Sequence, residues 1–257
     1  MLKAGSFKRN VGMHSKLVWK ILTLTILLVV LVRPVSAHRP GWGEEGRITE
    51  IENISTSYAF YEELGAGEPQ AEAGIAVTGE NDLADQAQAG EGVVDIYAFE
   101  ALAGQELYSA INIPALEGLE DYGVSLAVVG PGLPAADLDQ LPLTAPQGMG
   151  TRVFPSQQNE DFFEPFTQTR YWGRQEISLN LPETGEYYLA VWNPDGLPGK
   201  YVLATGRAEV FGPLDFFRFP VWWLQVHLYY GHGLYLAAGL AALATLVMGA
   251  VWLRQRR

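Results

Sequence analysis

Apolar and polar side chains alternate with period two in several short segments in the middle of the chain. Residues 93–102 and 106–114 both show this alternation, with Leu107 and Ile111 on one face of the second segment. The sequence Ala-Gly-Gln between the two segments is typical of a turn. Because alternation of this kind places one face of each segment in a core, the two segments predict a β-hairpin.

The same alternation predicts further strands at 47–52, 55–64, 122–129, 176–181, 186–192 and 200–205. Short strands separated by Gly and Pro turns, without an amphipathic helix among them, are typical of an all-β fold. We therefore predict an antiparallel sandwich or jelly roll in an exported domain at 38–210. Within it, 38–46 and most of 134–174 are predicted to be irregular. An acidic loop is predicted at about 65–92, mobile because its few apolar side chains do not offset the entropy of ordering.

Two continuous apolar runs lie outside the alternating region. The first, at 21–32, follows a basic start and precedes Val35, Ser36 and Ala37, which have the small side chains of a cleavage site. This arrangement predicts a secretory signal peptide at 1–37. An uncleaved anchor is the alternative, although 12 residues are short for a membrane span.

The second apolar run, at 234–253, holds 20 residues without a charge. At 1.5 Å per residue a helix of this length matches a hydrocarbon core of about 30 Å. We predict a transmembrane helix at 233–253 and a cytoplasmic tail at 254–257, whose three arginines agree with the positive-inside rule. The predicted location is therefore the cell membrane, with a single pass and the sandwich outside.

An aromatic segment at 211–232 precedes the predicted span. Tryptophan and tyrosine favour the headgroup region, so we predict an interfacial segment or a short interfacial helix that begins near Pro220. The residues predicted at the membrane interface are Trp222, Trp223, Tyr229 and Tyr230. His227 and His232 are five positions apart and therefore do not share a helix face, which argues against a metal or haem pair.

Small residues recur every fourth position in the predicted span, at Gly233, Ala237, Ala241, Thr245 and Gly249. Such a stripe lets two helix backbones approach closely. We therefore predict that the helix associates with a second copy or with the span of a membrane-protein partner, in addition to the lipid bilayer.

The charge of the exported domain excludes one class of partner. Residues 38–210 contain 28 Asp and Glu against 7 Lys and Arg, and such a surface repels nucleic acid.

The chain has no cysteine, which excludes disulfides, thiolate metal sites and thiol nucleophiles. After the signal, the histidines are His38, His227 and His232 and the lysine is Lys200, so Ser-His nucleophiles and Schiff-base chemistry lack their parts. We predict no enzymatic activity.

Aromatic and charged side chains gather at 162–172, and this segment is the candidate ligand-binding site. Read functionally, it is an aromatic platform for a carbohydrate or a peptide. Read structurally, it is a loop that packs its rings against one end of the sandwich. Its candidate residues are Phe162, Phe163, Glu164, Phe166, Arg170, Tyr171 and Trp172.

Carboxylates suggest two further kinds of site. Asp161 and Glu164 could form the acid and base pair of a glycosidase-like hydrolase, although many acidic residues make a chance pair expected. Calcium ligands could come from Glu117, Glu120 and Asp121 or from Asn193 and Asp195. An Asp-x-Asp-x-Asp-Gly loop does not occur, so neither a metal nor another cofactor is predicted.

Four pieces of the chain, 95–99, 103–107, 185–191 and 199–203, resemble bacterial pre-peptidase C-terminal domains. The resemblance implies a β-sandwich that is a non-catalytic appendage and that aids secretion or binds extracellular polymers, in some cases with calcium. The segment at 162–166 with Tyr171 and Trp172 is also similar to membrane-anchored bacterial proteins with a signal, a β-domain and one carboxy-terminal span.

These observations predict a non-catalytic extracytoplasmic binding or accessory module that is tethered by one helix and associates with a membrane partner. The alternative is a surface module that binds carbohydrate or peptide through 162–172. A carboxylate-based hydrolase is the third reading.

Overall fold

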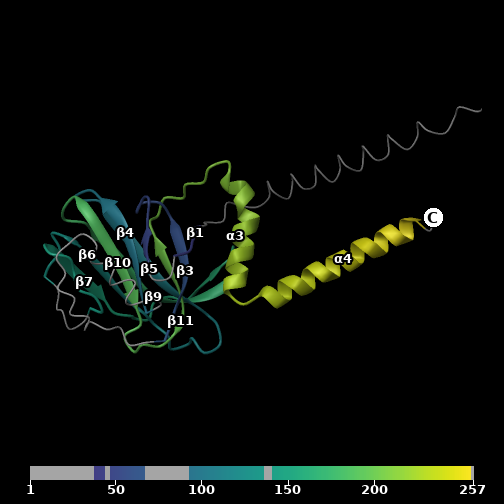
Figure 1. Cartoon of the computed structure of the whole chain (residues 1–257), viewed down its shortest axis with the longest axis horizontal. Helices are drawn as coiled ribbons and strands as arrows, with labels where there is room; N and C mark the ends of the chain where they lie inside the picture. The colour runs from purple at the N-terminus through teal and green to yellow at the C-terminus, as the bar shows by residue number, and fades with distance from the viewer. Residues whose placement is uncertain (1–37, 44–46, 67–92, 136–140, 256–257) are drawn as a thin grey trace, which may run out of the picture. The chain divides into compact units, whose positions relative to one another are not determined.

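The computed structural model describes residues 38–43, 47–66, 93–135 and 141–255. The predicted signal peptide at 1–37 and nearly all of the predicted acidic loop lie outside these residues. The described strands form two sheets, which Figure 1 shows as two layers. The predicted β-sandwich is therefore confirmed.

The larger sheet, called sheet A here, has six strands in the order β1-β3-β11-β5-β9-β8. Their bounds are β1 Arg39–Gly41, β3 Tyr58–Leu64, β11 Gly199–Thr205, β5 Glu106–Pro114, β9 Thr169–Asn180 and β8 Phe162–Glu164. The other sheet, sheet B, has five strands in the order β2-β4-β10-β6-β7. Their bounds are β2 Ile48–Glu50, β4 Val94–Ala101, β10 Gly185–Trp192, β6 Ser125–Pro131 and β7 Met149–Phe154.

The core lies between the two sheets and consists of the inward-facing side chains of alternate strand positions. Leu107 and Ile111 of β5 meet Leu126 and Leu189 of sheet B, and all four side chains are fully buried. Each such side chain stabilises the fold by about 1.5–3 kcal/mol relative to an exposed one. Both strands of the predicted hairpin are present, as β4 and β5, but they belong to different sheets and do not pair, so the prediction of a hairpin is wrong.

Two regions that were predicted to be irregular contain strands, and those predictions are wrong. β1 lies in the lead at 38–46, and β7, β8 and β9 lie in 134–174. Only the last part of β9 was predicted, as the strand at 176–181. The earlier part was missed because it buries the polar side chains of Arg174 and Gln175 and because a register shift opposite Ile111 and Asn112 interrupts its alternation. The pairs β1–β3 and β2–β4 are parallel, whereas the other strand pairs are antiparallel as predicted.

Two helices follow the sandwich, α3 at Asp215–Tyr229 and α4 at Gly233–Gln255. α3 begins five residues before Pro220, so the predicted start near that proline is wrong. Pro220 is the sixth residue of α3 and lies beyond the first turn, so the helix lacks the hydrogen bond that an N–H at this position would donate to the carbonyl of Phe216. The segment predicted as a span is helical. Among the residues that the structure describes, however, no helix combines the length and hydropathy that a membrane crossing requires.

Candidate functional site

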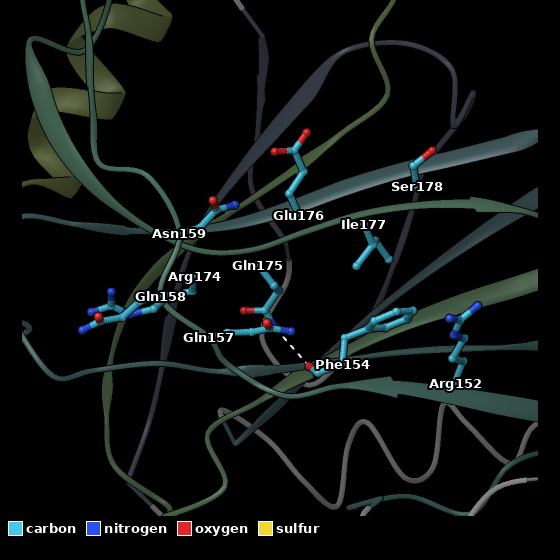
Figure 2. Close-up of a pocket in the computed structure, with 10 residues that line it drawn as sticks. All are labelled: Arg152, Phe154, Gln157, Gln158, Asn159, Arg174, Gln175, Glu176, Ile177 and Ser178. Carbon is cyan, nitrogen blue, oxygen red and sulfur yellow. Dashed lines mark hydrogen bonds between the residues drawn. The ribbon is translucent and has the colours of Figure 1, made fainter.

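A pocket of about 380 Å³ lies where β7 of sheet B faces β9 of sheet A (Figure 2). Its volume lies at the lower end of the range of about 300–1,000 Å³ that ligand-binding pockets commonly have. Three amide side chains come from the loop between β7 and β8, and the other lining residues come from the two strands. The lining residues are Arg152, Phe154, Gln157, Gln158, Asn159, Arg174, Gln175, Glu176, Ile177 and Ser178.

The pocket follows the edge of β9 rather than one of its faces. Successive residues of a strand point to opposite faces, and the pocket is lined by the five consecutive residues 174–178. In Figure 2, Glu176 and Ser178 point to one side of the strand and Gln175 and Ile177 point to the other. A ligand in this pocket would therefore lie against the outer edge of the strand.

Along this edge the main chain of β9 has hydrogen-bonding groups that no main-chain group of the described residues pairs. The N–H of Leu181 donates to the carbonyl of Gln105 at 2.9 Å, which directs Leu181 toward β5. Because alternate residues of an antiparallel strand direct their main-chain groups to opposite sides, Glu176, Ser178 and Asn180 direct theirs outward.

The β7–β8 loop covers the outer edge of β9 only in part. The N–H of Asn159 donates to the carbonyl of Gly173 at 2.9 Å, and the N–H of Gln157 donates to the carbonyl of Arg174 at 3.2 Å. β8 pairs with β9 over Thr169–Tyr171. From Glu176 onward, no strand or loop of the described part of the chain pairs with this edge.

Gln175 forms the floor of the pocket and links the two sheets. Its Nε2 donates to the carbonyl of Val124 at 3.0 Å and to that of Phe154 at 3.1 Å, the latter drawn in Figure 2. These two carbonyls fix the orientation of the amide, because only the nitrogen can donate. The Oε1 of Gln175 is buried and has no hydrogen-bond partner among the described residues, so a donor on a ligand or a water molecule would be stabilised there.

Positive charge gathers at this pocket in an otherwise acidic domain. Arg174 is buried and donates to the carbonyls of Tyr122 at 2.8 Å and Glu120 at 2.7 Å. Arg152 is exposed and lies over the ring of Phe154, 5.2 Å from its centroid. These are two of the 7 basic residues of 38–210. Glu176 also lines the pocket, so two guanidinium groups and one carboxylate give the lining a net charge of about +1. This charge favours carbonyl or carboxylate oxygens of a ligand more than the acidic surface around the pocket does.

The predicted aromatic site at 162–172 forms a hairpin whose side chains divide between two faces. Phe162 pairs with Tyr171, and their rings stack at 5.3 Å. Phe163 pairs with Arg170 and therefore lies on the opposite face of the sheet. Trp172 also lies on that face, packed against the core. The structure thus does not gather the predicted residues into one platform.

One face of this hairpin borders a small pocket of about 50 Å³, lined in part by Phe162, Glu164, Phe166 and Tyr171. This volume suits one or two water molecules rather than a sugar ring. Oε1 of Glu164 accepts a hydrogen bond from the N–H of Phe166 at 3.0 Å, and so the carboxylate stabilises the turn of the hairpin. Its proposed partner in a catalytic pair, Asp161, is exposed.

Tyr229 and Tyr230, two of the residues predicted at the membrane interface, contact the sandwich. The hydroxyl of Tyr229 shares its one proton between the carbonyls of Glu62, at 2.8 Å, and Tyr201, at 2.9 Å. Tyr230 is buried, and its hydroxyl is hydrogen-bonded to that of Tyr171. Trp222 and Trp223 of α3 are partly exposed.

The small residues predicted to mediate helix association fall at four-residue intervals in α4, beginning at its first residue, Gly233. Thr245 uses its hydroxyl within the helix, because its Oγ1 donates to the carbonyl of Ala241 at 2.8 Å. Ala237, Ala241, Thr245 and Gly249 are exposed. Whether a partner helix packs against them stays a prediction.

The candidate calcium ligands have other hydrogen-bonding roles. Asn193 donates to the carbonyl of Gly123 at 2.7 Å and accepts from the N–H of Asp195 at 2.9 Å. Glu120 accepts from the N–H of Gly118 at 2.9 Å, two residues from Glu120 in its own turn. Within the described ranges there is no group of three or more His, Cys, Asp or Glu side chains placed to hold a metal ion.

Two half-buried carboxylates, Glu62 of β3 and Asp95 of β4, lie on the inward faces of the two sheets, because each alternates with core residues. Oε1 of Glu62 accepts a hydrogen bond from the N–H of Gly43. The hydroxyl of Tyr201 donates to Asp95 at 2.5 Å. The pKa of Glu62 is raised to about 8, chiefly by burial; the hydrogen bond from Gly43 opposes this rise, and the charge of Asp95 adds to it.

Sequence reasoning missed the pocket between β7 and β9. Its amide and arginine side chains match no motif, and its defining property, the open edge of β9, depends on strand order. The one available signal was the run Gln157, Gln158 and Asn159 between two aromatic residues, which marks a polar loop without indicating what it faces.

No protein-family model matches the chain, and no curated protein matches it. Among solved structures, the chain is similar to PliG of Aeromonas hydrophila, a periplasmic inhibitor of g-type lysozyme, with 14% identity, 62% of this chain and 96% of that chain covered, and a TM-score of 0.30. It is also similar to the pre-peptidase C-terminal domain of Bacillus anthracis collagenase, with 12% identity and a TM-score of 0.28. The match covers 63% of this chain and 96% of that domain.

A third similar structure is the secreted protein MopE of Methylococcus capsulatus, with 13% identity and a TM-score of 0.29. The match covers 67% of this chain and 99% of that chain. A pre-peptidase C-terminal domain is thus among the structures that this chain is similar to, in line with the resemblance seen in its sequence. At these identities and TM-scores the similarities support no inference about a ligand.

Proposed function

We propose that this chain is a non-catalytic, extracytoplasmic binding module that is held at the membrane by α4 and binds an extended peptide segment along the open edge of β9. The observation that supports this proposal is the row of outward main-chain groups of Glu176, Ser178 and Asn180 beside a pocket of about 380 Å³. In strand addition, main-chain hydrogen bonds provide affinity and adjacent pockets provide side-chain specificity.

The surroundings of the edge suit such a ligand. A peptide strand beside β9 directs alternate side chains toward the pocket, where they meet the apolar surfaces of Ile177 and Phe154 and the amides of the β7–β8 loop. The buried Oε1 of Gln175 offers an acceptor, and the guanidinium of Arg152 offers donors.

The tether is proposed from the sequence. The run at 234–253 contains 20 uncharged residues, the number that a helix needs to cross a hydrocarbon core. The arginines that follow it favour a cytoplasmic carboxyl end, with the sandwich on the opposite side. Retention of the chain in membranes after carbonate washing tests this part independently of ligand binding.

The binding test uses the full chain in micelles and peptides selected against it from a displayed library. Ser178→Pro removes an outward N–H, and proline is tolerated where the N–H of an edge strand faces solvent. Ser178→Ala is the matched control, because it removes the hydroxyl and keeps the N–H. We expect the proline variant to weaken peptide affinity about tenfold, which corresponds to roughly 1.4 kcal/mol and one hydrogen bond.

Both variants should keep the wild-type melting temperature within a few degrees, which confirms that the β5–β9 pairing is intact. Equal peptide affinities of the two variants, measured by fluorescence anisotropy, would show that the main-chain edge is not the site. If the library yields no binding peptide and the full chain binds glycans instead, the peptide proposal is refuted.

A second candidate is a sugar-binding surface on the β8–β9 hairpin. It is favoured by the exposure of Phe162 and Phe163, 42% and 58% respectively, because exposed rings stack well on sugars. Phe163→Ala should abolish glycan binding without a change in melting temperature if this reading is correct. Trp172→Ala, in contrast, should lower the melting temperature because Trp172 packs against the core.

A further inference from the structure

α3 has two opposite apolar faces, and sheet A covers one of them. Val226 is fully buried and packs with Tyr61 and Val202 on the outer face of sheet A. The hydrogen bonds of Tyr229 and Tyr230 described above add to this contact. Nζ of Lys200 also donates to the carbonyl of Tyr229 at 2.6 Å, so the last turn of α3 is tied to β11.

The other apolar face of α3 is exposed. It consists of five side chains that are between 41% and 81% exposed, Leu214, Phe217, Val221, Leu224 and Leu228. Leu214 directly precedes the helix, and the spacing is alternately three and four residues. At about 100° per residue, the five lie within an arc of about 80° on the side opposite Val226. We call these five residues the α3 stripe.

A helix that is apolar on both sides is stable when both sides are covered, and a contiguous exposed apolar patch marks an interaction surface. We propose that the α3 stripe inserts into the surface of a lipid bilayer, so that α3 lies flat between the lipid and sheet A. This inference rests on the tether in the proposed function and specifies how the sandwich is oriented at the membrane.

The connection to α4 favours lipid over a protein partner. Residues 230–232 alone separate the end of α3 from Gly233, the first residue of α4. Three residues span at most about 11 Å, so a bilayer that holds α4 also lies at the end of α3. The stripe residue nearest to this connection, Leu228, is 52% exposed.

The charges of this part of the chain also favour lipid. Asp215 is the one acidic residue at 211–257, and its buried carboxylate is held by the N–H of Gly212 at 2.8 Å and by Arg39 at 2.7 Å. The acidic surface of the sandwich disfavours contact with anionic headgroups, but no carboxylate projects from the exposed side of α3. Arg218, whose side chain is 64% exposed, is near the stripe and suits lipid phosphates.

Insertion of the α3 stripe has a consequence for the orientation of the domain. Because α3 packs on the outer face of sheet A, lipid on the far side of α3 places sheet A nearer to the bilayer than sheet B. A tether alone would leave the sandwich free to tumble above the membrane, whereas insertion holds it in one orientation.

The absence of cysteine allows a direct test by single labelled positions in the full chain. Val221→Cys and Phe217→Cys report on the stripe, Leu102→Cys reports on an exposed leucine of the sandwich, and Ala242→Cys reports on α4. Each variant is labelled with an environment-sensitive nitrobenzoxadiazole dye and reconstituted into phosphatidylcholine vesicles. Quenching by nitroxide-labelled phosphatidylcholine is compared with quenching by iodide in water.

We expect the dyes at 217, 221 and 242 to shift to the blue, to be quenched by the nitroxide lipid and to lose most of their quenching by iodide. The dye at 102 should behave in the opposite way. Lipid quenching at 242 with free iodide access at 217 and 221 would overturn the insertion of α3 while leaving the tether intact.

Two other outcomes would overturn the inference for different reasons. Iodide access at 242 would show that the tether, and with it the proposed membrane location, is wrong. Dyes at 217 and 221 that both quenchers fail to reach, together with disulfide-linked dimers of unlabelled Val221→Cys, would show that a second copy covers the stripe.

Discussion

Glu62 makes the stability of the sandwich depend on pH in a direction opposite to that of most carboxylates. Its pKa rises from 4.5 to about 8 on folding, chiefly because burial disfavours the charged form and also because Asp95 lies nearby. The folded state therefore holds its proton more tightly than the unfolded state does. Its contribution to stability is complete below pH 4.5 and is lost as the pH rises through 8.

The magnitude follows from the size of the shift. A tenfold change in a proton-binding constant corresponds to about 1.36 kcal/mol, so a rise of the pKa from 4.5 to about 8 sets an upper limit of about 5 kcal/mol on the stability lost above pH 8. Glu62 keeps partial contact with water, and screening reduces the limit. We expect about 2 kcal/mol, or roughly 4–8 °C in melting temperature for a domain of this size.

Glu62→Gln tests this reasoning, because glutamine keeps the acceptor for the N–H of Gly43 and cannot ionise. Melting of the full chain in micelles is followed by circular dichroism between pH 4.5 and 9. The variant should match the wild type at the acidic end and be more stable at the alkaline end. Glu100→Gln, at an exposed position of β4, is the control and should leave the pH profile unchanged. A Glu62→Gln profile parallel to that of the wild type would refute the argument.

Four further predictions concern a hydroxyl of α3, two glycines of the sandwich and the small residues of α4. Tyr229→Phe removes the hydroxyl that donates to two strand carbonyls and should lower the free energy of unfolding by about 1 kcal/mol in urea titrations. Gly206→Ala should destabilise by roughly 2–3 kcal/mol, because the residue has a positive φ of 64° and a Cβ would lie 2.2 Å from a backbone oxygen. Gly118→Ala, with a φ of 90° and no atom near its Cβ, should cost only about 1 kcal/mol. Substitution of Ala241 and Thr245 by Leu should reduce dimer signal in a membrane association assay if the small-residue stripe is an interface, and an unchanged signal would exclude it.

The central strands could be predicted from the sequence because their inward residues alternate without interruption. Leu107 and Ile111 define β5, and Leu189 and Val191 define β10, all of them fully buried. β7 and most of β9 could not be predicted in the same way. Their segment buries Arg174 and Gln175, whose hydrogen bonds to distant carbonyls exist only after the two sheets have met.

The α3 stripe shows a second limit of structure prediction from the sequence. Its spacing of three and four residues was visible in the sequence, but the opposite face of the helix holds Trp223, Val226 and Tyr230, which are also apolar or aromatic. Because apolar residues surround the helix, its periodicity does not distinguish a face toward the sandwich from a face toward lipid. The contacts of Tyr229 and Tyr230 with sheet A resolve this ambiguity.

Hydrogen exchange along β9 tests most directly whether its open edge is the binding site. Amides of residues 175–181 are followed by mass spectrometry in the full chain, with and without a saturating selected peptide. We expect exchange at Glu176, Ser178 and Asn180 to slow strongly when the peptide is bound, while the amides of β10 do not change. Unchanged exchange in 175–181 under saturation, with protection confined to the β8–β9 hairpin, would contradict it.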